Sequence, residues 1–254
     1  MRADLGDHTT EADDTGGPGQ PVVLVHSALL DRHVWDTVTP LLGFRAITYD
    51  LRGHGAAAQA PPITGIPQLA TDLDRLLDVL GVQAAHLVGL SLGGAIVQEL
   101  AASRPRRVRS LTLLATACTF PRDPLLQRAA SMRELGRDRV VADTLARWFT
   151  PAVEPAVLDR AKHLLERIPE PVFEATWTAL AGYDATGAAA SLDSPVLALA
   201  AGADLSTPPV MLRRALELYP RATFAEIHEA PHLAPLEKPA EVATALRTFL
   251  TAAS

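Results

Sequence analysis

The sequence contains a single cysteine, Cys118, among its 254 residues. One cysteine cannot form an internal disulfide, which excludes the disulfide framework of small secreted proteins. No apolar run approaches the roughly 18 residues that a membrane span requires. Residues 1–20 also lack the basic start and the apolar centre of a secretory signal peptide. These absences predict a cytoplasmic protein that has no membrane partner.

Positive charge is not in excess, because 23 lysines and arginines face 29 acidic residues and leave a formal net charge of −6. Proteins that bind nucleic acid through charge need a basic surface, and the one basic run, from Arg104 to Arg109, is interpreted as a solvated loop. The histidines and acids do not cluster at the spacing of metal ligands. The sequence therefore predicts no nucleic-acid partner, no metal and no cofactor, and it makes no prediction of the oligomeric state.

Short apolar segments alternate with segments of helical periodicity along most of the chain. The first apolar segment, which begins at Val22, is continuous rather than alternating, as in a strand that is covered on both faces. We expect strands at residues 22–26, 45–49, 86–90, 108–115, 195–200 and 223–228. Predicted helices lie between them at residues 34–42, 66–80, 92–103, 208–218 and 239–250. This alternation predicts an α/β fold with a mostly parallel central sheet and helices on both faces.

Residues 119–190 break the alternation, because their periodicity is helical throughout. A helical block inserted between two strands would lie over the carboxyl edge of the sheet as a cap. We therefore expect a core of residues 21–118 and 191–254, with a helical cap at residues 119–190. Residues 1–20 are polar, acidic and rich in glycine, and we expect them to form a flexible N-terminal tail.

Ser91 lies in the pattern Gly-x-Ser-x-Gly, from Gly89 to Gly93, between a predicted strand and a predicted helix. In that context the serine occupies a strained turn that lifts its hydroxyl above the sheet, and the glycines permit a close approach of the backbone. The alternative is a dinucleotide-binding loop, which needs glycine at position 91 and an acid at the end of the next strand. That strand ends at Ala115 without an acid. The pattern therefore favours Ser91 as a nucleophile, with the backbone N–H of Leu92 as one oxyanion donor.

A serine nucleophile needs a neutral imidazole as its base and a carboxylate that orients the imidazole. When the serine lies in such a turn, these groups follow it in the order acid, then histidine, each on a loop after a strand. Asp204 follows the strand at residues 195–200, and His232 follows the last predicted strand. We therefore expect His232 to be the base and Asp204 the acid. Asp184 and Asp193 precede the strand at residues 195–200 and stay open as alternative acids.

The loop after the first predicted strand, from His26 to Leu29, is expected to supply the second oxyanion donor. We assign this role to the backbone N–H of Ala28, and removal of one such donor typically costs ~3–4 kcal/mol of transition-state stabilisation. His26 and His54 lie on loops at the same edge but precede the serine in the chain. Both are interpreted as structural hydrogen-bonding residues.

Large apolar side chains of the predicted cap are expected to roof a mostly apolar pocket for a small-molecule substrate. Packing of the cap onto itself is the alternative for each of them. Arg133 and Arg137 are interpreted as a solvated helix face rather than as an anchor for a substrate carboxylate, and Cys118 as a small buried hydrophobe. The residues expected to line the pocket are Leu29, Trp35, Met132, Trp148, Trp177 and Leu233.

Five segments together resemble the α/β-hydrolase superfamily, with the nearest likeness to 3-oxoadipate enol-lactonase-like proteins and small esterases. They are Leu24-Val25-His26-Ser27, Asp50-Leu51-Arg52-Gly53-His54-Gly55, Gly89-Leu90-Ser91-Leu92-Gly93-Gly94, Asp204 to Pro208, and Pro231-His232-Leu233. The resemblance implies an α/β-hydrolase fold whose cap is inserted before the acid-bearing strand. Two strands that usually precede the first parallel strand in this fold have no evident counterpart in residues 1–20.

The leading hypothesis is hydrolysis of a small ester or lactone through an acyl-enzyme on Ser91, with His232 as base and Asp204 as acid. One alternative keeps the same site for non-hydrolytic or C–C bond chemistry, as in a lyase, a cyclase or a C–C hydrolase. In those enzymes the serine–histidine pair often moves protons. The other alternative is a small-molecule receptor, because a fold can retain catalytic residues while it serves another role.

Overall fold

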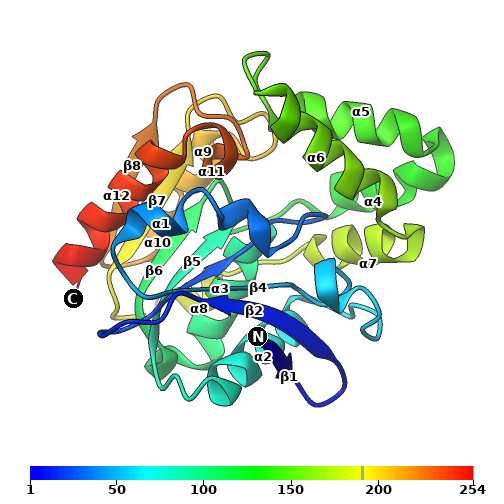
Figure 1. The fold of residues 1–254 in the computed structure, drawn as a ribbon. Coiled ribbons are helices and arrows are strands. Elements are labelled where there is room, and N and C mark those ends of the chain that lie inside the picture. Colours follow the sequence, from blue (N-terminus) through cyan, green and yellow to red (C-terminus); the bar gives the residue numbers. More distant parts are fainter. Residues whose placement is uncertain (190–191, 254) are drawn as a thin grey trace.

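Six parallel strands form the centre of the structure, a computed structural model that describes residues 1–189 and 192–253. Two antiparallel strands extend one edge, which gives the sheet order β1-β2-β4-β3-β5-β6-β7-β8 (Figure 1). The strands are β1 (Arg2–Asp4), β2 (Thr9–Asp14), β3 (Val22–Val25), β4 (Ala46–Tyr49), β5 (Ala85–Leu90), β6 (Val108–Leu114), β7 (Val196–Ala201) and β8 (Ala222–Ile227).

The strand order reverses at β3, because β4 pairs with one side of β3 and β5 with the other. The position between β3 and β5 is therefore the topological switch point of the sheet. In open α/β sheets this switch point is where ligands bind. Both strands consist of buried residues throughout, which explains their continuously apolar sequences.

Helices cover both faces of the sheet (Figure 1). The short helix α1 (Thr39–Leu42) packs against the C-terminal helix α12 (Pro239–Ala253), and α2 (Ile66–Val79) packs against α3 (Leu92–Ser103). Short elements complete the connections: α8 (Thr186–Ala189), α9 (Pro209–Arg213), α10 (Ala215–Leu218), α11 (Ala234–Glu237), and the 3-10 turns at Arg32–Trp35, Gly55–Ala57 and Pro105–Arg107. The predicted α/β fold, with a mostly parallel sheet covered on both faces, is confirmed.

Residues 1–20 do not form the flexible tail that we expected. Their polar composition conceals a hairpin, since β1 pairs with β2, and β2 pairs antiparallel with β4. Ala12 is fully buried, and Thr10 donates a hydrogen bond from Oγ1 to the carbonyl oxygen of Asp50 at 2.7 Å. An edge hairpin needs few apolar residues because β4 supplies its hydrogen-bond partners and only one of its faces is covered. The two strands that seemed to be missing are therefore present.

Among the described residues, five helices lie between β6 and β7: the short α8 and four longer helices where we expected a cap. The four longer helices are α4 (Arg122–Leu135), α5 (Arg137–Trp148), α6 (Pro155–Arg167) and α7 (Glu170–Leu180). In Figure 1 this group projects from one end of the sheet, and α4 packs along α7. Among the described residues, no helix is long and apolar enough to cross a lipid bilayer.

Candidate active site

Ser91 occupies the turn between β5 and α3 in a strained conformation. Its backbone angles are φ 54° and ψ −111°, which side-chain-bearing residues rarely adopt. Hydrogen bonds hold the turn against the neighbouring strand: the Ser91 N–H donates to the carbonyl of Leu114 at 3.0 Å, and Thr116 donates from Oγ1 to the carbonyl of Ser91 at 2.7 Å. The surrounding structure thus fixes the geometry that the Gly-x-Ser-x-Gly pattern predicted.

The two glycines of that pattern are required by close contacts between backbones. A Cβ at Gly89 would lie 2.3 Å from the carbonyl oxygen of Gly93, and a Cβ at Gly93 would lie 2.3 Å from the carbonyl oxygen of Val25. The second contact brings the start of α3 directly against the end of β3. The loop that follows β3 therefore begins beside the Ser91 turn.

His232 and Asp204 form a buried pair beside this turn. The Nδ1 atom of His232 lies 2.7 Å from Oδ2 of Asp204. The other oxygen of the carboxylate, Oδ1, accepts the backbone N–H groups of Ser206 at 2.7 Å and Thr207 at 2.9 Å. Burial by itself would raise the pKa of Asp204, but the charge and hydrogen bond of His232 and the donors of Thr207 outweigh burial and hold that pKa below its ordinary value.

The other two acids that the sequence left open lie outside this pair. Asp184 and Asp193 are both exposed. Asp184 accepts the backbone N–H of Thr186 at its Oδ1, and the carbonyl of Asp193 accepts a hydrogen bond from Arg221. Of the three candidate acids, the structure brings Asp204 to His232.

Ser91 and His232 line the same cavity, which has a volume of about 230 Å³. The helices between β6 and β7 contribute Trp148 and Trp177 to its wall, two of the six residues that we expected to line a pocket. The ring of Trp148 stacks on His232 with centroids 6.0 Å apart. The remaining lining residues are Phe120, Pro121, Pro124, Leu125, Arg128, Leu180, Ser206, Thr207 and Met211.

The loop after β3 and the start of α3 differ from their neighbours in how their backbone N–H groups are paired. Leu29 has a positive φ of 65°, and its N–H donates to Nε2 of His54 at 3.1 Å. In contrast, the N–H groups of Ala28 and Leu92 donate no hydrogen bond to another described residue. These are the two N–H groups that the sequence assigned to an oxyanion.

Comparison with known proteins places this geometry in a family. A family model described as alpha/beta hydrolase fold matches residues 20–154, which is more than half of the chain. The chain belongs to the α/β-hydrolase family. The match includes the Ser91 turn and the first helices of the cap, and the predicted membership of the superfamily is confirmed.

Relatives of this α/β-hydrolase include lactonases and esterases. The chain is 31% identical to 3-oxoadipate enol-lactonase 2 of Acinetobacter baylyi over 197 residues, which cover 76% of this chain and 73% of the relative. The solved enol-lactonase of Burkholderia xenovorans superposes with a TM-score of 0.92 at 26% identity, over 99% of this chain and 100% of the other. A malate-bound esterase of Thermogutta terrifontis gives 0.89 at 28% identity, over 100% and 99% of the two chains.

Two buried histidines of the α/β-hydrolase core hold the loop after β3. His26 and His54 lie edge to face with ring centroids 5.5 Å apart. In each ring Nε2 accepts a backbone N–H, from Leu51 for His26 and from Leu29 for His54, and Nδ1 lies within 2.9 Å of a backbone carbonyl. This arrangement requires the neutral form with the proton on Nδ1. Both residues are the structural hydrogen-bonding groups that the sequence predicted.

Acid is expected to destabilise the fold through these histidines. Burial, with an electrostatic contribution from the neighbouring His26 ring, lowers the pKa of His54 to about 4 from 6.5. The unfolded chain therefore binds more protons between pH 6.5 and pH 4, so the free energy of unfolding is complete above pH 6.5 and falls as the pH drops through this window. A tenfold difference in proton affinity corresponds to about 1.4 kcal/mol. His54 alone should therefore remove roughly 2 kcal/mol of stability between pH 7.5 and pH 5.

Urea unfolding of wild type and His54→Gln at pH 7.5 and pH 5 measures this effect. The variant should be less stable at pH 7.5, because the Leu29 N–H loses its acceptor, but it should lose less stability on acidification. His228→Gln is the matched control, since that side chain is 90% exposed. Equal losses on acidification in wild type and His54→Gln would assign the pH dependence to other groups.

Four predicted pocket residues lie outside the cavity of this α/β-hydrolase. Leu29, Trp35, Met132 and Leu233 are all buried and pack into the hydrophobic core instead. Cys118 is also fully buried, as predicted, and burial raises the pKa of its thiol to about 12. Since Cys118 does not line the cavity, the structure gives no reason to expect thiol reagents to block it.

Arg128 is the arginine of the cavity wall that the sequence analysis missed. It lies three positions after Leu125 and four before Met132, which puts all three on one face of α4. That spacing was the available signal, because Leu125 and Met132 both turn inward in the structure. The sequence analysis considered Arg133 and Arg137 instead of Arg128. Arg133 is exposed and pairs with Glu174, and Arg137 donates to the carbonyls of Glu166 and Ile168.

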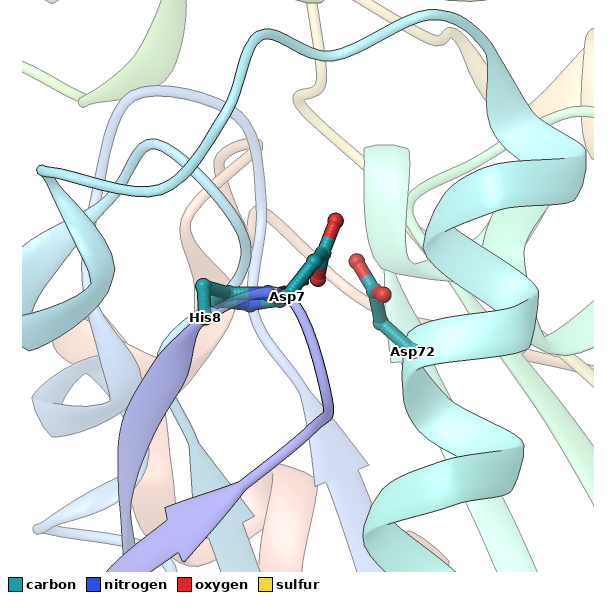
Figure 2. Close-up of side chains that lie close together, drawn as sticks. All are labelled: Asp7, His8 and Asp72. Carbon is teal, nitrogen blue, oxygen red and sulfur yellow. Dashed lines mark hydrogen bonds and ion pairs between the residues drawn. The ribbon is translucent and has the colours of Figure 1, made fainter.

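Asp7, His8 and Asp72 are the one group of described residues whose ligand atoms approach closely enough for a metal ion, within 4.8 Å of one another (Figure 2). A cation already lies between the two carboxylates. Arg52 donates from Nε and Nη2 to Asp72 at 2.8 and 2.9 Å, and from Nη1 and Nη2 to Asp7 at 3.0 and 2.9 Å. The guanidinium satisfies this cluster, which ties the N-terminal hairpin to α2.

Proposed function

We propose that this α/β-hydrolase cleaves small esters or lactones through an acyl-enzyme on Ser91. The observation that carries the proposal is the meeting of two features at one cavity: a serine held in a strained turn and a buried histidine–aspartate pair. The similarity to an enol-lactonase and to an esterase supports ester or lactone chemistry. The small cavity, with its two tryptophans, supports a small substrate.

In the proposed mechanism, Nε2 of His232 takes the hydroxyl proton while Oγ of Ser91 attacks the substrate carbonyl carbon. Asp204 accepts the Nδ1–H of His232 and thereby keeps Nε2 free to act as a base. The carbonyl oxygen becomes an oxyanion, which the unpaired N–H groups of Ala28 and Leu92 stabilise.

The tetrahedral intermediate then collapses, and the bond from the carbonyl carbon to the alcohol oxygen breaks. His232 returns its proton to that oxygen, which leaves as an alcohol or, in a lactone, stays attached to the acyl group. A water molecule, deprotonated by His232, attacks the Ser91 ester in the second half of the reaction. Release of the carboxylic acid restores the Ser91 hydroxyl and the neutral imidazole.

Labelling with a fluorophosphonate probe tests this proposal. Wild type should form a covalent adduct on the Ser91 peptide, and Ser91→Ala should form none. His232→Ala should label slowly, since Ser91 then lacks its base. Incubation with esters and lactones should give a transient mass increase equal to the acyl group. Labelling without any acyl adduct during turnover would favour proton-transfer chemistry, as in a lyase or a cyclase. No labelling of folded protein by small probes would favour a receptor.

A further inference from the structure

The cavity beside Ser91 contains a cation that has no counter-ion. Arg128 projects from α4 into the wall of this cavity. Its Nε and one terminal nitrogen, Nη2, are buried and make no hydrogen bond, and no described carboxylate forms an ion pair with it. Its remaining contact is with an aromatic face, because Cζ lies 4.0 Å from the ring centroid of Trp177.

The two described arginines that are buried as whole residues both bind carboxylates. Arg32 binds the carboxylates of Asp13, Asp50 and Glu11, and Arg52 binds those of Asp7 and Asp72. A buried guanidinium that has no such partner is costly, because it loses water without gaining a compensating hydrogen bond. Arg128 therefore does not belong to a structural ion pair, and its guanidinium lacks an anionic partner among the described residues.

The charged side chains around Arg128 do not neutralise its guanidinium. Burial and the neighbouring positive charge of Arg147 lower the pKa of Arg128 to about 9, so the side chain stays cationic at neutral pH. Asp143 lies with Arg128 and Arg147 around a neighbouring surface depression, but it pairs with Arg139 at 2.8 Å. An anion that enters the cavity would therefore meet the cationic side chain of Arg128, which no described carboxylate neutralises.

We propose that Arg128 binds a free carboxylate of the substrate, so that this enzyme selects esters or lactones that carry a second, ionised carboxyl group. The inference rests on the proposed function, since it takes Ser91 to be the acylated residue. A carboxylate is the ligand of choice because it matches the planar fork of donors that a guanidinium presents. Arg128 and Ser91 line the same small cavity, which restricts the substrate to a short chain between the carboxylate and the reacting carbonyl.

Matched pairs of chromogenic esters test the selectivity. The 4-nitrophenyl monoester of glutaric acid carries a carboxylate on its acyl part, and 4-nitrophenyl pentanoate is its neutral counterpart. Acetoxybenzoate and phenyl acetate form the second pair, with the carboxylate on the leaving group. Wild type should prefer the anionic member of at least one pair. Arg128→Met, which keeps an apolar contact with Trp177, should lower kcat/KM for that member by roughly 10- to 100-fold and change the neutral member less than about threefold.

Two further variants separate recognition from structure. Arg128→Lys retains the charge but loses the fork, so it should recover part of the preference. Arg133→Met is the matched control on the same helix, because Arg133 is exposed and pairs with Glu174; its preference should equal that of wild type. Loss of activity toward both members of a pair in Arg128→Met, or a wild type that prefers neither anionic ester, would overturn the inference.

A binding measurement makes the result independent of turnover. Glutarate should bind to the Ser91→Ala protein and should bind at least roughly tenfold more weakly to the Ser91→Ala, Arg128→Met double variant. Absence of glutarate binding together with indifference to the ester carboxylate would refute the role of Arg128 while probe labelling of Ser91 still stood. Conversely, glutarate binding that depends on Arg128 in a protein that forms no acyl adduct would refute the hydrolase proposal alone.

Discussion

Replacing Ser91 with alanine is expected to lower kcat/KM for ester or lactone hydrolysis by roughly 10⁵- to 10⁶-fold. The variant removes the atom that forms the acyl bond, and His232 and Asp204 cannot compensate because they act only through that atom. The fold should be retained. Alanine keeps the Cβ that already exists at φ 54° and ψ −111°, and the hydrogen bonds that hold the turn use only the backbone of residue 91.

Initial rates with a neutral aryl ester, together with a thermal unfolding curve, measure both parts of this result. Ser103→Ala is the control, since Ser103 is an exposed serine at the other end of α3. It should have the activity of wild type. Retention of more than about one hundredth of the wild-type rate in Ser91→Ala would contradict an acyl-enzyme on this residue.

Replacing Asp204 with asparagine is the second large change, and we expect kcat to fall about 10⁴-fold. The reason lies in how the two carboxylate oxygens are used. Oδ1 accepts two backbone N–H groups, from Ser206 and Thr207, so the amide oxygen of asparagine must stay there. The amide NH₂ then faces Nδ1 of His232. A donor in that place forces the imidazole proton onto Nε2, where the base is needed, and the histidine can no longer accept the proton of Ser91.

Steady-state kinetics of Asp204→Asn and Asp193→Asn check this expectation. Asp193 is exposed and was an alternative acid in the sequence, so its asparagine variant should be indistinguishable from wild type. A fluorophosphonate time course separates the cause, since a wrong imidazole tautomer slows adduct formation as well as turnover. An unchanged rate in Asp204→Asn would remove Asp204 from the proposed triad.

The sequence could predict the parts of this molecule whose geometry is local. The turn at Ser91 follows from a strand, a helix and two glycines within a few residues. The order of Asp204 and His232 along the chain places each at the carboxyl end of a parallel strand, and such ends share one edge of the sheet. These features require no knowledge of how distant side chains pack.

The parts that sequence analysis missed depend on partners far away in the chain. The strand β2 is polar, and only the exposed edge of β4 makes a strand of it. Trp35 and Met132 are as apolar as Trp148 and Trp177, yet they face the core, because the direction of a side chain depends on how its helix is rotated. Arg128 was missed for a related reason. What distinguishes it is that no described carboxylate pairs with it, and a sequence does not show which side chains lack a partner.

The N-terminal hairpin also has a consequence for anyone who shortens or tags this chain. Without β1 and β2, the backbone groups of β4 would be left unpaired along a full strand, and such an open edge is a template for intermolecular pairing and aggregation. Arg52 would also lose Asp7 and keep Asp72 as its one carboxylate partner. It lies two residues before His54, which holds the loop after β3. We therefore expect removal of the first fourteen residues to promote aggregation, and a tag at the C-terminal helix to disturb the fold less than a tag at the N-terminus.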